Sequence, residues 1–273
     1  MQNYYTYTAQ QLVESAKIPI HMVGSSETLF NTMAREMADV IVKNNQKSDE
    51  TALIVPVGPT GQYAPFIEMV NRERIDLRGC WFFNMDEYLG DDGKWIEADH
   101  SLSFRAFMDR EVWDRIPREL LPPPAQRIFP KPEDPAEMSV LLEELGGADV
   151  CFGGIGINGH LAFNEAEPEM SVEAFSALGC RVLDISAETR VANAIASLGG
   201  ALEMMPTRAV TIGMKEILSS KAIRLGVLRD WHRAVVRRAA CGPVEAGFPA
   251  SLLQRHPDVK IYCNDVAAER AFS

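Results

Sequence analysis

The chain has 273 residues, with 27 Lys and Arg against 38 Asp and Glu, which gives a formal net charge of −11 at pH 7. This length and a hydrophobic content of 47% are ordinary for one large globular domain, whereas the acidic balance argues against binding to nucleic acid, which depends on clustered Lys and Arg. No run of 18 apolar residues and no basic-then-apolar leader occurs, so we expect neither membrane spanning nor secretion, and a cytoplasmic location.

Short apolar runs alternate with amphipathic segments of ten to twenty residues, a pattern typical of βα units and a parallel sheet. We therefore predict an α/β fold: a single-domain, Rossmann-like, doubly wound, mostly parallel sheet with helices on both faces, over 18–273, preceded by an N-terminal extension, 1–17. In chain order, the expected elements are a helix at 26–45 capped by Ser25 or Ser26, strands at 52–57 and 80–85, a helix at about 134–145, and strands at 149–155, 209–214, 223–228 and 259–263.

Ligands of open parallel sheets bind at the carboxyl ends of the strands, so the residues that follow each strand are the candidates for a site. The first such edge is 55–61, Val-Pro-Val-Gly-Pro-Thr-Gly, which leads from a strand into a helix. Gly58, Thr60 and Gly61 are candidate phosphate contacts, because glycine lets backbone N–H groups approach an anion and the helix N-terminus adds partial positive charge. A plain strand-to-helix turn explains the same residues equally well.

The second edge, 83–88, ends an apolar strand with the adjacent carboxylates Asp86 and Glu87. Neighbouring side chains of an extended backbone point to opposite sides, so at most one of the two is expected to enter a shared cleft. A carboxylate in a half-buried cleft is a good proton acceptor for carbon acids, whereas the alternative is a helix cap or a solvated loop charge.

The third edge, 153–165, places four glycines in seven positions, followed by His160 and Glu165. Imidazole titrates near neutrality, and Glu165 is positioned to orient it and to stabilise its cation. A metal site is not indicated, because the other histidines, at 21, 100, 232 and 256, form no cluster with ligand spacing. A serine hydrolase is not indicated either, because GxSxG is absent.

With Phe-Asn-Met-Asp-Glu-Tyr at 83–88, Gly-Gly-Ile-Gly at 153–156 and Gly-His-Leu-Ala-Phe-Asn-Glu at 159–165, the sequence resembles the glucosamine-6-phosphate deaminase (isomerase) family. That family lies within a larger group that includes 6-phosphogluconolactonases and ribose-5-phosphate isomerases. The similarity covers about 18–265, with softer matches at 100–108, 189–193 and 249–256. The Asp-Glu-Arg and His-Thr-Ala-Ser-Leu-Phe versions of these motifs that are typical of the lactonases are missing, which favours aldose–ketose chemistry.

The resemblance implies an amino-sugar phosphate deaminase/isomerase that needs no cofactor and no metal and converts glucosamine 6-phosphate into fructose 6-phosphate and ammonia. His160, supported by Glu165, would open the sugar ring, and Asp86 would move the proton from C2 to C1, which suits a carboxylate with a raised pKa. Further contacts with the substrate or its phosphate are expected from Glu87, Gly156, Gly159, Arg105 and Arg233, together with the loop at 58–61.

Two departures from the family pattern bear on this reading. Asn158 stands where the deaminases have an Asp, which removes an anion near His160 and is expected to lower the pKa of the imidazole; relatives assigned to galactosamine 6-phosphate resemble this chain there. Ile195 stands where they have a phosphate-binding Arg, and a Lys after the strand at 223–228 is missing, although Arg229 or His232 could replace it. The substrate is then a differently placed anion or is not phosphorylated.

Two other functions stay open at this stage. One is a galactosamine-6-phosphate isomerase or another sugar-phosphate isomerase or lactonase, and the other is a non-catalytic protein that binds a sugar phosphate. The expected partner is a small sugar phosphate rather than nucleic acid or a membrane, and the sequence leaves open whether the chain forms a homo-oligomer.

Overall fold

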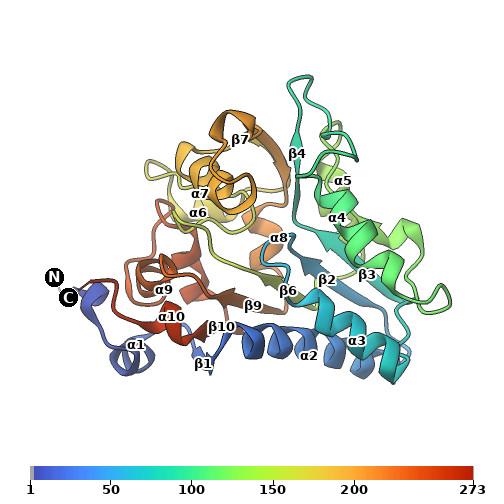
Figure 1. Ribbon diagram of the computed structural model, residues 1–273, viewed down its shortest axis with the longest axis horizontal. Helices are drawn as coiled ribbons and strands as arrows, with labels where there is room; N and C mark the ends of the chain where they lie inside the picture. Colours follow the sequence, from blue (N-terminus) through green and yellow to red (C-terminus); the bar gives the residue numbers. More distant parts are fainter. Residues whose placement is uncertain (1–2, 273) are drawn as a thin grey trace.

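The computed structural model describes residues 3–272 of the chain, and a parallel sheet lies at its centre (Figure 1). Over these residues the sheet has seven strands, in the order β1-β10-β9-β6-β2-β3-β5. Their bounds are β1 (Ile20–Gly24), β2 (Thr51–Val55), β3 (Cys80–Asn84), β5 (Arg127–Ile128), β6 (Val150–Gly153), β9 (Ala222–Val227) and β10 (Val259–Asn264). The predicted mostly parallel α/β fold is therefore confirmed.

Successive residues of the central strands enter two different hydrophobic cores, one on each face of the sheet. In β2, Leu53 and Val55 pack on one side and Ile54 on the other, and all three are fully buried. One core is covered by α2 (Ser26–Asn45), α3 (Tyr63–Glu73) and α4 (Phe104–Glu111), and the other by α1 (Ala9–Ser15), α5 (Ala136–Glu144), α8 (Met214–Leu218), α9 (His232–Cys241) and α10 (Asp265–Ala268). Burial on both faces explains the uninterrupted apolar runs.

The helix predicted at 26–45 forms with those bounds, and Ser25 is its N-cap, since its hydroxyl accepts a hydrogen bond from the Thr28 N–H. The remaining short helices are α6 (Val172–Ser176) and the 3-10 turns Tyr4–Thr6, Trp113–Arg115, Pro124–Gln126, Leu202–Met204 and Pro249–Arg255. Among residues 3–272, no helix is long and apolar enough to cross a membrane.

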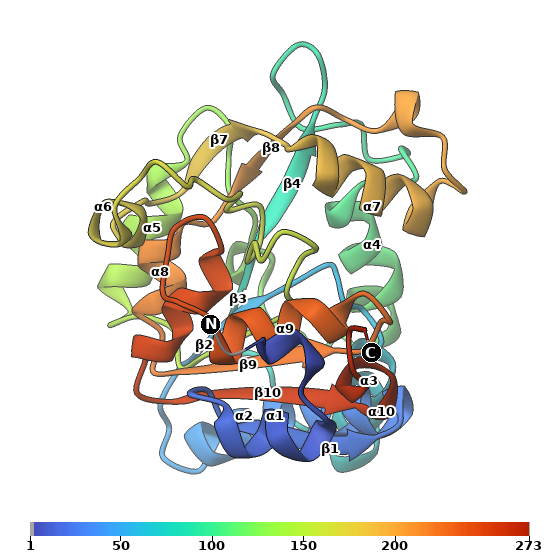
Figure 2. The same cartoon turned by 90° about the vertical axis from the view of Figure 1, so that its left-hand side faces the viewer.

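A second, antiparallel sheet stands above the carboxyl end of the first and carries α7 (Ala187–Ser197) beside it (Figure 2). Its strands are β4 (Asp86–Leu89), β8 (Arg208–Thr211) and β7 (Arg181–Asp184), with β8 in the middle. The prediction that 209–214 joins the parallel sheet is therefore wrong. The chain leaves β3 and continues at once into β4, which offers a free edge there, and β8 pairs with that edge, with Asp86 opposite Thr211.

The described part of the predicted extension packs on α9. Thr8 and Gln11 form a capping box at the start of α1, and Leu12 is fully buried. The Arg237 guanidinium, itself in α9, donates two hydrogen bonds to the Tyr7 carbonyl. The division of the chain at residue 17 stays a prediction, but the segment before it contributes to the core of the domain.

Candidate active site

The loop after β6 closes on itself around His160. The Gly156 N–H donates to the His160 carbonyl and the Gly159 N–H donates to the Gly156 carbonyl, each at 2.9 Å. A Cβ at Gly156 would lie 2.0 Å from the imidazole ring, and Gly159 has φ +85° with Phe248 only 2.7 Å from where its Cβ would be. The prediction that these glycines contact the substrate is corrected accordingly: their N–H groups are used inside the loop, and glycine is needed to make room for the ring.

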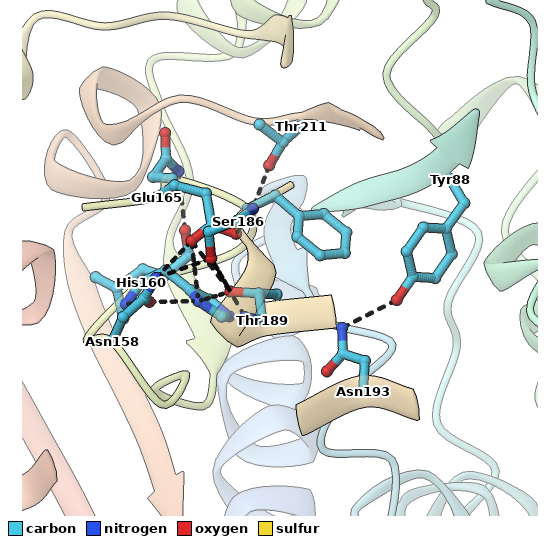
Figure 3. A network of polar contacts seen from close by, with 11 residues as sticks. Tyr88, Asn158, His160, Glu165, Ser186, Thr189, Asn193 and Thr211 are labelled. Atoms are coloured by element: carbon cyan, nitrogen blue, oxygen red, sulfur yellow. Dashed lines mark hydrogen bonds and ion pairs between the residues drawn. The ribbon is translucent and has the colours of Figure 1, made fainter. Parts of the chain in front are cut away.

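Asn158 and Thr189 orient the His160 imidazole (Figure 3). The Asn158 Oδ1 lies 2.8 Å from Nδ1 of His160, and the Thr189 Oγ1 lies 3.1 Å from the same nitrogen. The Asn158 amide donates its hydrogens elsewhere and the Thr189 hydroxyl donates to Glu165, so both oxygens accept from His160. Nδ1 therefore carries the proton, and Nε2 is left with its lone pair as a base.

Glu165 accepts three hydrogen bonds, from the Asn158 amide at 2.6 Å, the Thr189 hydroxyl at 3.0 Å and the Ser186 N–H at 3.3 Å. These three donors fix the position of the carboxylate. Its Oε2 lies 3.8 Å from Nδ1 of His160, so it acts on the ring through charge rather than through a direct hydrogen bond. The structure thus brings together Asn158, His160 and Glu165 as the sequence analysis expected, with Asn158 as the contact between the other two.

Burial lowers the pKa of His160, and the Glu165 charge opposes this only in part. The effect of Asn158 on this pKa stays a prediction, because burial by itself accounts for the direction. The ring is neutral near pH 7, with Nδ1–H held by its neighbours, and it can accept a proton at Nε2.

Sequence reasoning missed Ser186 and Thr189, which complete the network from the start of α7. Ser186 is the N-cap of that helix, because its hydroxyl accepts from the Thr189 N–H, and it also receives the second hydrogen of the Asn158 amide at 3.3 Å. Further along α7, Asn193 donates to the Tyr88 hydroxyl at 3.0 Å (Figure 3). The available signal was the Thr-Arg-Val-Ala-Asn match at 189–193, which was read as similarity without a role.

Asp86 lies at the tip of β3, where the chain enters the second sheet. It is only 7% exposed, and no described residue forms a hydrogen bond with its carboxylate. Burial, with a smaller contribution from Glu87, raises the pKa of Asp86 to about 8. A carboxylate that is shielded from water and has no hydrogen-bond donor is a stronger base than an exposed one.

A short series of contacts links Asp86 to His160. Asp86 pairs with Thr211 across β4 and β8, and the Thr211 hydroxyl accepts the Phe163 N–H at 3.1 Å. The Phe163 ring lies 5.3 Å from that of Tyr88 and 6.3 Å from the His160 ring, between centroids. The tip of β3 and the loop after β6 are thus joined through one strand pair and one aromatic side chain.

No protein-family model matches the chain, but individual proteins do. It is 29% identical to the glucosamine-6-phosphate deaminase of Lachnoclostridium phytofermentans over 240 residues, which cover 86% of this chain and 96% of the relative. The corresponding protein of Clostridium perfringens is 29% identical over 254 residues, covering 89% and 95%. The chain is a relative of the glucosamine-6-phosphate deaminases.

Solved structures agree with this relationship. A monomeric glucosamine-6-phosphate deaminase superposes with a TM-score of 0.76 at 28% identity, covering 91% of this chain and 98% of that one. The 6-phosphogluconolactonase of Trypanosoma brucei superposes with a TM-score of 0.66 at 16% identity over 93% of this chain and 98% of its own, which shows a shared fold. The resemblance read from the three strand-end motifs is thereby confirmed.

In this relative of the deaminases, Glu87 is a structural anchor, and its predicted contact with the substrate is wrong. The side chain is fully buried and points away from Asp86 toward the start of α4. It accepts from the N–H groups of Tyr88, Phe104 and Arg105, from the Ser103 hydroxyl and from the Arg105 guanidinium. A carboxylate with this many protein donors has no capacity left for a ligand.

The two cations predicted to meet the phosphate already have other partners. Arg105 pairs with Glu87 at 3.1 Å, donates to the Ile96 carbonyl and lies 4.5 Å above the Trp95 ring. Arg233 donates to the Val266 carbonyl and pairs with Glu269 at 2.6 Å. Neither arrangement supports a role in holding phosphate.

In the part of the chain that the structure describes, the turn at 58–61 has no such competing partners. Within residues 3–272, the N–H groups of Gly58, Thr60 and Gly61 have no hydrogen-bond partner, and the turn is not buried. Gly61 lies against Phe30, whose ring would be 2.3 Å from a Cβ at that position, so the close approach requires glycine. Binding of a ligand by this turn stays a prediction.

Proposed function

We propose that this chain is a deaminating aldose–ketose isomerase of amino sugars, of the type named in its relatives, for which glucosamine 6-phosphate yields fructose 6-phosphate and ammonia. One observation carries the proposal: His160 is held as the Nδ1–H tautomer, and the contacts through Thr211 and Phe163 connect its loop to a buried carboxylate, Asp86. Among the described residues, neither Nε2 of His160 nor the Asp86 carboxylate has a hydrogen-bond partner. Binding a sugar alone requires neither feature.

Ring opening falls to His160. Its Nε2 takes the proton of the C1 hydroxyl and delivers a proton to the ring oxygen, which needs a group that both accepts and donates near pH 7. The imidazolium formed in between is stabilised by the Glu165 carboxylate at 3.8 Å, while Asn158 and Thr189 keep the ring in place.

Isomerisation and deamination fall to Asp86. The carboxylate removes the proton from C2 of the open-chain aldehyde while the aldehyde oxygen takes a proton from solvent, which gives an enolamine. Asp86 then returns its proton at C1, which leaves an iminium at C2. Addition of water to the iminium releases ammonia and the ketose. A base with a pKa of about 8 is well matched to this step, because the strength of the base and its ionised fraction are balanced near neutral pH.

The test measures ammonia release from glucosamine 6-phosphate and galactosamine 6-phosphate in parallel, together with solvent deuterium exchange at C2. We expect turnover of at least one sugar and loss of exchange in Asp86→Asn, with the exposed Asp91→Asn as the matched control. Preference for the galacto sugar would favour the galactosamine-6-phosphate isomerase. If neither sugar releases ammonia and one of them raises the melting temperature, the chain is a sugar-phosphate binder and the proposed reaction is wrong.

A further inference from the structure

A cavity of about 550 Å³ lies between α7 and the segment that follows β9. It adjoins the catalytic network at two points: Ile157, in its wall, precedes Asn158, and Glu188, also in its wall, precedes Thr189. Figure 2 shows α7 above the central parallel sheet. The cavity thus lies beside the loop that carries His160 and beside the start of α7, and its volume is that of an ordinary small-molecule site.

The wall of this cavity is apolar. Seven of its nine lining side chains are apolar, among them Ile157, Val191, Ile195 and Trp231. Ile195 is 68% exposed and Val191 is 43% exposed, so α7 turns hydrophobic side chains toward open space. Exposed apolar side chains that gather around a cavity mark a surface that a ligand covers.

The cavity offers a phosphate dianion a single cation, Arg229. Its two charged residues, Arg229 and Glu188, are both exposed and have opposite signs. His232, next to Trp231, does not add a cation: its Nε2 donates to the Ile155 carbonyl and its Nδ1 accepts from the N–H groups of Leu228 and Arg229. Burial lowers the pKa of His232 to about 4, so the ring is neutral.

We propose that this cavity receives the end of the amino sugar remote from C1 and C2, and that this end is uncharged and apolar, as in a 6-deoxy amino sugar, rather than a phosphate. The inference rests on the proposed function, because it takes a sugar bound at His160 and Asp86 to extend into the neighbouring cavity. A methyl group at C6 gains from contact with Ile195 and Val191, whereas a phosphate would lose water without meeting paired cations.

The experiment compares glucosamine 6-phosphate, glucosamine and 6-deoxyglucosamine as substrates. We expect kcat/KM to be at least tenfold higher for 6-deoxyglucosamine than for glucosamine 6-phosphate. Ile195→Arg places a cation in the cavity and is expected to shift this ratio toward the phosphate by tenfold or more. Met204→Arg is the matched control, since Met204 is 62% exposed and lies outside the cavity wall, and it should leave the ratio unchanged.

Thermal stabilisation by the same three sugars is measured alongside, because it reports binding without turnover. If glucosamine 6-phosphate releases ammonia with a kcat/KM tenfold higher than that of 6-deoxyglucosamine, the inference is wrong and the proposed function still holds. If no sugar releases ammonia, the proposed function fails, and the order of stabilisation decides the inference: stronger stabilisation by the phosphate overturns it, and stronger stabilisation by 6-deoxyglucosamine supports it.

Discussion

Replacing Asp86 by Asn tests whether burial has made this carboxyl group a base matched to neutral pH. The side chain is 7% exposed without a hydrogen-bond partner among the described residues, and its pKa rises from 3.8 to about 8. Between these two values the folded protein keeps a proton that the unfolded chain loses, so the wild type loses stability as pH rises. Asn is nearly the same size and does not titrate. The free energy of unfolding of Asp86→Asn minus that of the wild type should therefore increase by about 1.4 kcal/mol for each pH unit between pH 5 and 7.

Urea denaturation of the two proteins at pH 5, 6 and 7 measures that slope, with the exposed Asp91→Asn as the control that should show none. The same pKa predicts that kcat/KM of the wild type rises about tenfold from pH 7 to pH 9, as the ionised fraction of the base increases. A stability difference that does not change between pH 5 and 7 would show that Asp86 titrates as an exposed carboxyl does, and the argument for a base raised by burial would be lost.

Three further substitutions test the rest of the site. Asn158→Asp places a charge 2.8 Å from Nδ1 of His160 and should raise the pKa of that ring, measured by NMR of the imidazole; an unchanged titration would mean that position 158 does not tune it. Gly156→Ala must displace the ring and should lower kcat about 100-fold, whereas Gly79→Ala, with nothing within 4 Å of its Cβ, should not. Glu87→Gln should reduce the free energy of unfolding by roughly 3 kcal/mol in urea, and a change below 0.5 kcal/mol would contradict the anchoring role.

The parallel sheet was predictable because its strands are buried on both faces and so read as uninterrupted apolar runs, as in β2, where every residue is buried. The second sheet was not. The four residues of β4 are Asp-Glu-Tyr-Leu, which no apolar pattern identifies as a buried strand, and they are buried because Glu87 is satisfied by α4 and because β8 supplies the partner edge. That edge is a tertiary feature, so local sequence assigned β8 to the wrong sheet.

In the candidate site, too, some residues were predictable from the sequence and others were not. His160 stood out because glycines before it signal a backbone that needs space, and the ring does occupy the space of a Cβ at Gly156. Ser186 and Thr189 did not stand out, because a Ser three residues before a Thr at the start of a helix reads as an ordinary N-cap, which Ser186 also is. Their second role is to hold Asn158 and Glu165, and it depends on the fold bringing the loop after β6 against the start of α7.

The geometry around Asn158 explains why an amide rather than an acid suits this position. An amide presents an acceptor and a donor at once, and Asn158 uses both, toward Nδ1 of His160 at 2.8 Å and toward Glu165 at 2.6 Å. An Asp in the same pose would bring two carboxylate oxygens 2.6 Å apart, which is tolerated only if a proton is shared between them or if an imidazolium compensates for the charge. A site in which burial favours the neutral form of His160 has less charge to balance, and an amide fits it better than an acid. If the sugar end in the cavity is uncharged, as we propose, Asn158 beside His160 and Ile195 in the cavity wall both suit a less charged substrate.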